Sequence, residues 1–230
     1  MSTVLKIRLL SKTYKTNKED LQILKNINLD IHSGEVIAIQ GPSGCGKSTL
    51  ISVIAGLDTY DAGEIEILGT SMKQLSSMKW NEFRAQNIGI IFQQFHLLEH
   101  LTAIENIRLP LDLKAAVDAD ALALAALEKV GLKERAEHFQ RELSRGESQR
   151  VAIARALVMQ PKLILADEPT ASLDVKTARE VSEMIFKLAR SENIAALIVT
   201  HDPSIADLCD RTYLMNDGCL ILKTHMEKEI

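Results

Sequence analysis

Residues 41–48 read Gly-Pro-Ser-Gly-Cys-Gly-Lys-Ser and fit the pattern G-x-x-x-x-G-K-S/T of a phosphate-binding loop. An apolar run at 35–40 precedes the motif and a helix-like stretch at 48–55 follows it. Glycines here let successive backbone N–H groups turn toward phosphate oxygens, and the partly positive start of the helix faces the same anion. The alternative is an ordinary glycine-rich turn, but the strand before the motif and the helix after it favour a nucleotide site.

Two side chains at the end of the motif add further chemistry. The ammonium group of Lys47 is expected to reach the β- and γ-phosphates, and the Ser48 hydroxyl is expected to ligate the Mg²⁺ that bridges them. The residues expected to contact the nucleotide in this segment are Gly41, Pro42, Ser43, Gly44, Cys45, Gly46, Lys47, Ser48 and Thr49.

Composition and charge limit the class of protein. The chain has 230 residues, a net charge of -4 and a pI near 5.9, so it carries no diffuse basic field and nucleic acid is not favoured as its principal partner. A hydrophobic content of 46% with only 4% aromatic residues is enough for a sizeable aliphatic core. We expect a single globular domain over 1–230.

Cysteine usage and hydropathy indicate where the chain works. Cys45, Cys209 and Cys219 form no metal-type cluster and leave an odd thiol, which fits a reducing compartment. A charge interrupts residues 1–8 before a secretory apolar core could form, and no run of 18 uncharged apolar residues occurs. We therefore expect a chain that is soluble by itself, so that any membrane-spanning segments come from another polypeptide.

The first part of the chain is rich in short strand patterns, at 4–9, 27–31, 36–40 and 64–68. Alternation in the first, second and last of these predicts a sheet with one solvated face. The middle of the chain favours helix at 118–130, ending at Gly131, where a left-handed C-cap is expected. This change of character predicts a helical insertion.

Buried-strand patterns return at 163–166 and 195–200, with an amphipathic helix between them that carries Val181, Ile185 and Leu188. Strand, helix and strand at this spacing predict a parallel sheet. The segment 212–222 has apolar runs on either side of Asp217-Gly218 and is expected to form a hairpin, followed by a loose polar tail at 223–230.

Two adjacent carboxylates follow the buried strand at 163–166. The strand is expected to deliver Asp167 and Glu168 to the sheet edge where open α/β sheets bind ligands. Asp167 suits the Mg²⁺ shell, and Glu168 suits a base that orients and deprotonates water for attack on the γ-phosphate. The alternative is a strand that runs into an acidic turn, but the phosphate loop favours the catalytic interpretation.

The segment 143–156, Leu-Ser-Arg-Gly-Glu-Ser-Gln-Arg-Val-Ala-Ile-Ala-Arg-Ala, decides the subclass. Ser144 is a natural N-cap with Glu147 at N3, and such a helix start exposes N–H groups to an anion. A well-capped helix is the alternative. With the phosphate loop before it and Asp-Glu-Pro-Thr-Ala-Ser-Leu-Asp at 167–174, however, the chain resembles the ATP-binding subunit of ABC transporters over almost its whole length.

This resemblance implies an α/β fold. Its parts are a P-loop NTPase (RecA-like) core with a parallel sheet, an N-terminal antiparallel β subdomain, and a helical subdomain at about 94–160, inserted before the second nucleotide-binding strand. The stretches 92–98, 101–107 and 109–111 look most similar to the branch containing macrolide-efflux, lipoprotein-release and cell-division ATPases.

The resemblance also implies roles for further residues. Tyr14 resembles the aromatic that stacks on adenine, and Gln93 the glutamine that touches Mg²⁺ and senses the γ-phosphate. Asp174 resembles the aspartate of the loop that crosses between subunits, and His201 the switch histidine on the γ-phosphate. Taken singly, such residues are more often packing or surface residues. The implied catalytic set is Lys47, Gln93, Glu168 and His201, the implied metal set is Ser48, Gln93 and Asp167, and Ser144, Gly146, Glu147 and Asp174 are expected to contact ATP across a subunit interface.

The sequence departs from the family pattern at two places. In the family, the serine of the signature segment, which corresponds to 144–149 here, is usually followed by two glycines. Arg145 takes the place of the first glycine and brings bulk and positive charge near the phosphate of the facing subunit. We expect a competent site with altered affinity. Ser172 replaces a small residue or Asn in the crossing loop, which is expected to be harmless. His96 and His100 lie four residues apart but lack a third metal ligand at suitable spacing.

The implied mechanism needs partners. In the family, the phosphate loop and the signature lie on distant surfaces of one subunit, so that two subunits meet head to tail and enclose two ATP molecules. The resemblance implies that an integral membrane permease docks near 95–101, which would place this chain in the cytoplasm on the inner face of the membrane. The alternative for 95–101 is that its large apolar residues fill the core of the helical subdomain. A soluble ABC-type ATPase acting on nucleic acid or ribosomes remains as an alternative. A P-loop kinase would need neither the segment 144–149 nor Glu168.

Overall fold

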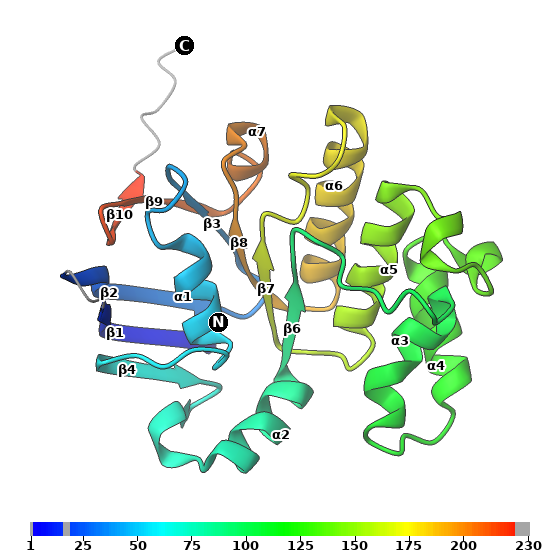
Figure 1. The fold of residues 1–230 in the computed structure, drawn as a ribbon, viewed down its shortest axis with the longest axis horizontal. Coiled ribbons are helices and arrows are strands. Elements are labelled where there is room, and N and C mark those ends of the chain that lie inside the picture. Colours follow the sequence, from blue (N-terminus) through cyan, green and yellow to red (C-terminus); the bar gives the residue numbers. More distant parts are fainter. Residues whose placement is uncertain (1, 16–18, 224–230) are drawn as a thin grey trace.

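The computed structural model describes residues 2–15 and 19–223, whose strands form two sheets (Figure 1). The first is antiparallel, with strand order β2-β1-β4-β5. On its inner face Ile7 stands opposite both Leu29 and Ile65, all three fully or nearly fully buried. Its members are β1 (Thr3–Lys15), β2 (Asp20–His32), β4 (Ala62–Ile67) and β5 (Thr70–Ser71).

The second sheet has six strands in the order β10-β9-β3-β8-β7-β6. All neighbours are parallel except β10, which runs antiparallel to β9. The parallel sheet expected from the strand-helix-strand pattern is therefore confirmed. Its members are β3 (Val36–Gln40), β6 (Ile88–Ile91), β7 (Leu163–Asp167), β8 (Ala195–Val199), β9 (Arg211–Asn216) and β10 (Cys219–Lys223).

The central strands of this second sheet are buried on both faces, because alternate side chains enter two different cores. In β3, Val36 and Ala38 join the core under the helices, whereas Ile37 and Ile39 face the antiparallel sheet. The helix α1 (Lys47–Ile54) lies in that second core with its apolar residues buried. The phosphate loop is thus attached to a helix enclosed between two sheets (Figure 1).

The remaining helices gather mostly on the other side of the parallel sheet (Figure 1). Three of them, α3 to α5, follow β6 and precede β7 in the sequence, which is the place expected for a helical insertion. The helices are α2 (Ser77–Asn87), α3 (Ala103–Asp112), α4 (Ala119–Lys129), α5 (Arg145–Leu157), α6 (Val175–Ser191) and α7 (Pro203–Ala206), with 3-10 turns at Met72–Gln74, Lys133–Arg135 and Gln140–Glu142.

Most of the helices and strands predicted from the sequence are present in the structure, although their first and last residues differ from the predicted ones. The strands expected at 4–9 and 27–31 fall inside the longer β1 and β2, and the helix expected at 118–130 is α4, with Gly131 in the left-handed region at φ 70°. The hairpin around Asp217 and Gly218 is confirmed as β9 and β10. The expected tail at 223–230 begins one residue too early because Lys223 pairs with Thr212, and 224–230 lie outside the described residues.

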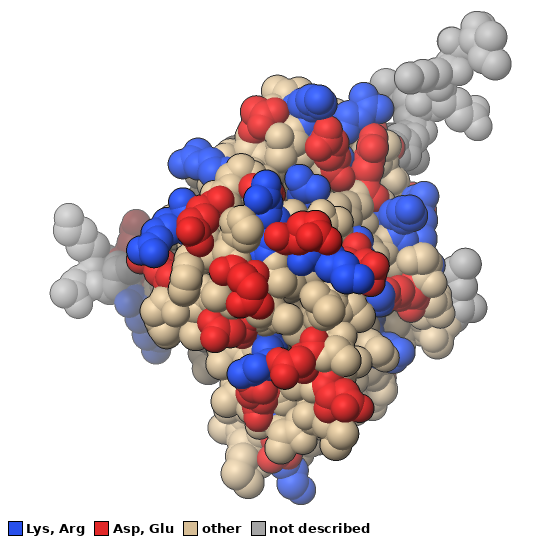
Figure 2. Space-filling view, turned by 90° about the vertical axis from the view of Figure 1, so that its right-hand side faces the viewer, with Lys and Arg blue, Asp and Glu red and all other residues tan. Residues whose placement is uncertain are grey.

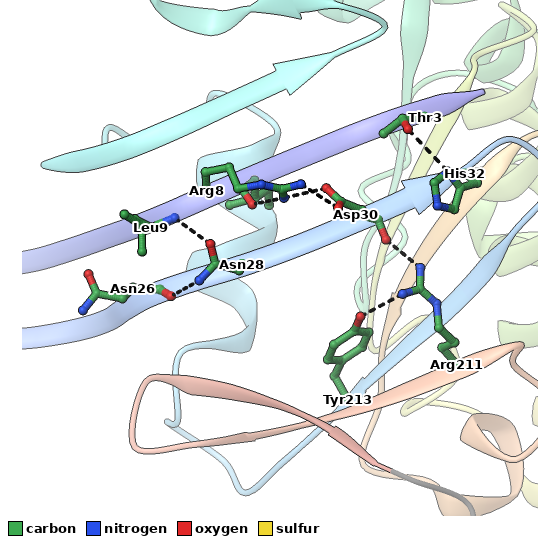
Figure 3. A network of polar contacts seen from close by, with 10 residues as sticks. Thr3, Arg8, Leu9, Asn26, Asn28, Asp30, His32, Arg211 and Tyr213 are labelled. Carbon is green, nitrogen blue, oxygen red and sulfur yellow. Dashed lines mark hydrogen bonds and ion pairs between the residues drawn. The ribbon is translucent and has the colours of Figure 1, made fainter. Parts of the chain in front are cut away.

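A polar network joins the two sheets (Figure 3). Both terminal nitrogens of Arg8 donate to the Asp30 carboxylate, at 2.6 and 2.7 Å, which links β1 to β2. From β9, Arg211 donates to the Asp30 carbonyl at 2.7 Å and to the Tyr213 hydroxyl at 3.0 Å. Its Nε also donates to Glu35 at 2.5 Å, and this hydrogen bond raises the pKa of Arg211 above its usual value. Arg211 therefore holds the antiparallel sheet against the parallel one.

The outer face of the helical insertion carries charges of both signs, interspersed with uncharged side chains (Figure 2). Arg108 of α3, for example, pairs with Asp112 on its own helix and with Asp120 of α4. Exposed pairs of this kind contribute little to stability. The face is solvated and is held in place by the apolar core beneath it.

Replacing Arg211 by Met keeps much of the side-chain volume and removes the guanidinium. We expect a loss of about 1–3 kcal/mol in the free energy of unfolding, measured by urea denaturation, because the Glu35 carboxylate, only 13% exposed, loses its cation. Adding Glu35→Gln is expected to cost less than the sum of the two single losses. As a control, Arg190→Met breaks the exposed pair with Asp210 and is expected to cost below about 0.5 kcal/mol. Equal losses of stability for the Arg211 and Arg190 variants would contradict the role of Arg211 in joining the two sheets.

Candidate functional site

The phosphate loop leaves the end of β3 and enters α1 through Gly46, which adopts φ 109°. This left-handed conformation is open to glycine, and a side chain there would also approach the carbonyl oxygen of Ile23 within 2.9 Å. Gly46 offers no side-chain cap to the helix. The first N–H groups of α1 therefore lack the side-chain acceptor that most helix starts possess, and they suit an anion.

Lys47 lies inside this loop. Its Nζ donates to the carbonyl oxygens of Gly41 and Pro42, both at 2.8 Å, and the residue is buried. The loop's own backbone thus holds the ammonium group close to the start of α1. A phosphate oxygen can replace these carbonyls as acceptor without a large movement of the side chain.

A cavity of about 560 Å³ opens at this loop. It brings together five side chains that sequence analysis singled out, Lys47, Ser48, Gln93, Glu168 and His201. They come from α1 and from segments that follow β6, β7 and β8. The lining consists of Ile23, Gly41, Pro42, Ser43, Gly44, Gly46, Lys47, Ser48, Thr49, Gln93, Glu168, Ala171 and His201. We call it the nucleotide cavity.

Ile23 and Ala171 line the cavity although sequence analysis did not select them. Ile23 belongs to β2, and a single apolar residue in a strand carries no signal of such a position. Cys45, in contrast, was expected to contact the nucleotide and is absent from the lining; its Sγ lies near Gly41 on the protein side of the loop.

Glu168 and His201 face one another at the edge of the sheet. Glu168 directly follows β7 with φ 48°, and its Oε2 lies 2.8 Å from Nδ1 of His201. Because a carboxylate only accepts hydrogen bonds, Nδ1 carries the proton. Glu168 is largely covered, with a side chain 16% exposed, whereas that of His201 is 68% exposed. The pair thus combines a sheltered carboxylate with an exposed imidazole.

Asp167 lies one residue earlier, at the end of β7. Its Oδ1 is buried and has no hydrogen-bond partner among the described residues. A buried unpaired carboxylate oxygen is costly, so its presence points to a ligand. No three His, Cys, Asp or Glu side chains gather as a metal site within residues 2–15 and 19–223, so a cation here would share its coordination with other oxygens. Ser48 and Gln93 line the nucleotide cavity and Asp167 does not, but the oxygens of all three side chains are of the kind that a hard cation such as Mg²⁺ prefers.

The signature segment has the expected helix start. Ser144 Oγ accepts from the Glu147 N–H at 3.2 Å, and Glu147 Oε2 accepts from the Ser144 N–H at 2.8 Å, which confirms the capping box. The backbone hydrogen bond from Ser144, the largest cause, holds the pKa of Glu147 below its usual value. Gly146 packs so closely on α6 that a Cβ would lie 2.5 Å from the Thr177 methyl group.

A second cavity, of about 340 Å³, lies at this helix start. It contains Ser144, Gly146 and Asp174, and Asp174 caps α6 by accepting from the Thr177 N–H at 3.1 Å. Its lining consists of Ser144, Arg145, Gly146, Arg150, Ser172, Leu173, Asp174 and Thr177. We call it the signature cavity. It shares no residue with the nucleotide cavity, so one chain holds two separate parts of the predicted site.

Arg145 and Ser172, the two residues that depart from the family pattern, contact one another. Arg145 Nη1 donates to the Ser172 carbonyl at 3.3 Å, and Ser172 Oγ donates to the Gln93 carbonyl at 3.5 Å. Arg145 therefore turns toward the crossing loop of its own chain. Ser172 connects the signature cavity to Gln93 in the nucleotide cavity through a long, weak hydrogen bond.

Tyr14, near the end of β1, does not line the nucleotide cavity. Its hydroxyl donates to Asp58 Oδ2 at 2.5 Å, and the Lys12 ammonium lies 4.8 Å from the ring centroid. Hydrogen bonding to Asp58 raises the pKa of Tyr14, and a smaller opposing contribution comes from the side chain of Thr49, at the end of the phosphate loop. The ring thus lies beside the loop rather than in the cavity.

None of the helices in the described part of the chain is both long enough and apolar enough to cross a bilayer.

A family model and the sequences of related proteins agree on the kind of protein that this chain resembles. A family model described as ABC transporter matches residues 24–171, more than half of the chain. An uncharacterized ABC transporter ATP-binding protein of Bacillus subtilis, YvrO, is 46% identical over 220 residues, 93% of each chain. The lipoprotein-releasing system ATP-binding protein LolD of Shewanella oneidensis is 42% identical over 221 residues, 94% of this chain and 95% of that protein.

Solved structures show the same likeness. The ATP-binding cassette MJ0796, in a dimeric post-hydrolysis state bound to ADP and Pi, superimposes with a TM-score of 0.86 at 39% sequence identity. The match covers 94% of this chain and 96% of that one.

The unpaired Asp167 oxygen allows a test without ligand. Asp167→Asn is expected to leave the free energy of unfolding unchanged or to raise it by up to about 1 kcal/mol, because the variant removes the charge from a carboxylate whose Oδ1 is buried without a hydrogen-bond partner. Asp30→Asn is the matched control and is expected to cost about 1 kcal/mol, since both Asp30 oxygens accept from Arg8. Urea denaturation measures both, and a loss above about 1 kcal/mol for the Asp167 variant would show a purely structural carboxylate.

Proposed function

Because the chain belongs to the ABC transporter family and is an ATP-binding and ATP-hydrolysing subunit of that family, we propose that two copies of it divide each catalytic site between them. One observation carries this proposal: the nucleotide cavity and the signature cavity share no residue. We propose that each ATP molecule contacts the nucleotide cavity of one chain and the signature cavity of the other. A two-fold, head-to-tail pair supplies both cavities to each of two ATP molecules.

The phosphate loop is the proposed binding site for the phosphates of ATP. Backbone N–H groups of 41–49 surround the phosphate oxygens, and Lys47 exchanges its two carbonyl partners for the β- and γ-phosphates. The uncapped start of α1 adds its partial positive charge. Tyr14 is the proposed stacking platform for adenine, at the side of the loop where Thr49 lies.

Glu168 is the proposed general base. Its carboxylate lines the nucleotide cavity and is sheltered from solvent, which strengthens its interaction with a water molecule beside the γ-phosphate. The water oxygen attacks the γ-phosphorus, its proton passes to Glu168, and the bond to the leaving ADP oxygen breaks. His201 is proposed to turn from Glu168 to the γ-phosphate, which frees Oε2 for the proton.

Ser48, Gln93 and Asp167 are the residues proposed to hold Mg²⁺, which would supply charge that neutralises the phosphate oxygens. The buried Oδ1 of Asp167 supports this assignment, because it is the one oxygen of the three side chains that is both buried and unpaired among the described residues.

The second copy is proposed to contribute Ser144, Gly146, Glu147 and Asp174. The helix start at Ser144 presents N–H groups to the γ-phosphate, with Glu147 held in the capping box. The solved MJ0796 cassette is described as dimeric, and 39% identity over nearly the whole chain supports the same association here. We propose a homodimer that ATP closes and hydrolysis opens.

A separate integral membrane permease is the proposed partner. A third cavity, of about 430 Å³, lies beside Gln93 and is lined in part by Phe95, Leu97 and Glu99. Leu97 is buried and belongs to the helical core, so it gives the cavity an apolar contact surface. We propose that a short cytoplasmic helix of the permease docks there, placing this chain in the cytoplasm at the inner face of the membrane.

The name of LolD as a lipoprotein-releasing system protein supports a permease of the macrolide-efflux or lipoprotein-release type. Relatives over nearly the full length are described as transporter or lipoprotein-releasing ATP-binding proteins, so a soluble ATPase acting on nucleic acid or ribosomes is not favoured.

Glu168→Gln tests the proposed base and the dimer together. Turnover, measured as phosphate release, is expected to fall roughly 10²-fold or more, because the carboxamide cannot take the proton from water. Addition of ATP is expected to shift the variant from monomer to dimer on size exclusion, and ADP is not. Glu183→Gln, on the exposed side of α6, is the matched control and should retain turnover. Turnover unchanged in the Glu168 variant would exclude Glu168 as the base.

Glu99→Trp tests the docking cavity. The large ring is expected to occupy the cavity and to lower recovery of the membrane partner from detergent extracts several-fold, with tagged wild-type chain as the reference. Leu113→Trp places the same ring at an exposed position outside that cavity and should leave recovery unchanged. Equal recovery of the membrane partner with both variants would show that the permease does not dock in this cavity.

A further inference from the structure

Four residues beside the phosphate loop form a compact polar cluster, which we call the Asp58 cluster: Lys12, Tyr14, Asp58 and Thr59. Asp58 Oδ1 accepts from the Lys12 ammonium at 2.9 Å, and Oδ2 accepts from the Tyr14 hydroxyl at 2.5 Å. Lys12 also donates to Thr59 Oγ1 at 3.2 Å. Each carboxylate oxygen therefore has its own donor.

The cluster is well sheltered at its centre. Lys12 is only 5% exposed, so its ammonium depends on Asp58 and Thr59 to replace water. The Tyr14 hydrogen bond, the largest cause, lowers the pKa of Asp58, and the same bond raises the pKa of Tyr14. At neutral pH the carboxylate is therefore ionised and the phenol keeps its proton, as the hydrogen bond requires.

These contacts determine how the Tyr14 ring is presented. Its hydroxyl is fixed by Asp58, and the Lys12 ammonium lies over the ring, 4.8 Å from its centroid. The preceding residue is also held, because the Thr13 N–H donates to Asp61 Oδ2 at 2.6 Å. Tyr14 nevertheless remains 38% exposed. The ring is thus held in place while part of the residue stays open to a planar group, such as a purine base.

The cluster also connects this ring to the phosphate loop. Asp58 lies in the turn that directly follows α1, where its N–H and that of Leu57 both donate to the Ser52 carbonyl. The helix α1 begins at Lys47, so one rigid helix carries the phosphate loop at one end and the anchor of Tyr14 at the other. The spacing between ring and loop is therefore determined by the protein before a nucleotide arrives.

We propose that Asp58 is a positioning residue for nucleotide binding, which orients the Tyr14 ring for stacking on the base and relates it to the phosphate loop through α1. The inference rests on the proposed function of Tyr14 as the stacking platform. It predicts that disruption of the cluster weakens the contribution of the base to affinity and leaves that of the phosphates intact.

The test compares the affinities of ADP and of inorganic pyrophosphate by calorimetry. Tyr14→Ala is expected to weaken ADP binding about 10-fold or more, because the stacking surface is lost. Asp58→Asn and Tyr14→Phe are expected to weaken it about 3- to 10-fold, because the ring remains but is no longer oriented. Pyrophosphate affinity should stay within about 2-fold of wild type in all three variants. Asp112→Asn, on the exposed side of α3, is the control and should change neither affinity.

Tyr14→Phe keeps the proposal testable if Asp58→Asn does not fold, because it leaves the Lys12–Asp58 pair in place. A spectroscopic measurement adds a direct readout. The phenol absorbance of Tyr14, identified by its loss in Tyr14→Phe, should titrate at lower pH in Asp58→Asn, since the hydrogen bond to a carboxylate raises its pKa.

The outcomes distinguish a failure of the proposed stacking role of Tyr14 from a failure of the positioning role of Asp58. If Tyr14→Ala leaves the ratio of ADP to pyrophosphate affinity unchanged, the proposed function of Tyr14 fails. If Tyr14→Ala changes that ratio but neither Asp58→Asn nor Tyr14→Phe does, only the positioning role of Asp58 fails. A parallel loss of both affinities in the Asp58 and Phe variants would likewise overturn the inference, since Asp58 would then act on the phosphate loop as a whole.

Discussion

The uncapped start of α1 is the constraint on which the rest of the site depends. The helices α5 and α6 begin with side-chain caps from Ser144 and Asp174, whereas Gly46 offers none to α1. Helix N–H groups without a partner carry partial positive charge and are costly when sheltered. The fold nevertheless encloses α1 between two sheets, where Leu50 and Ile54 are fully buried. Hydrophobic burial thus fixes an anion-binding helix end at one edge of the parallel sheet.

The position of that helix depends in turn on how the two sheets meet. Arg211 donates to Glu35, the residue before β3. It also donates to the carbonyl of Asp30 in β2 (Figure 3), so the strand leading to the phosphate loop is joined to the antiparallel sheet. A second connection comes from Asp58, which follows α1 and accepts hydrogen bonds from Lys12 and Tyr14 of β1. Both polar connections limit how far the helix and the sheets can move apart.

Local sequence patterns predicted the elements whose stability is mainly local or mainly apolar. The helix α4, the β9–β10 hairpin and the buried strands β7 and β8 follow from periodicity, turn residues and apolar runs. The helices α2 and α3 were not predicted. In α2 the only buried residue is Trp80, so no amphipathic pattern is visible, and in α3 Pro110 lies inside the helix and obscures it. The capping box of Thr102 and Glu105 was the signal that could have revealed α3.

By itself, the sequence determined the motifs to which the chemistry is assigned. The phosphate loop, the Asp167-Glu168 pair and the signature helix are contiguous, and their local conformation follows from their own glycines, caps and apolar flanks. Only the tertiary structure decided which of them meet. The contact of Glu168 with His201 joins residues 33 apart, and that of Tyr14 with Asp58 joins residues 44 apart. Such contacts depend on sheet order and on the packing of α1, which no short stretch of sequence encodes.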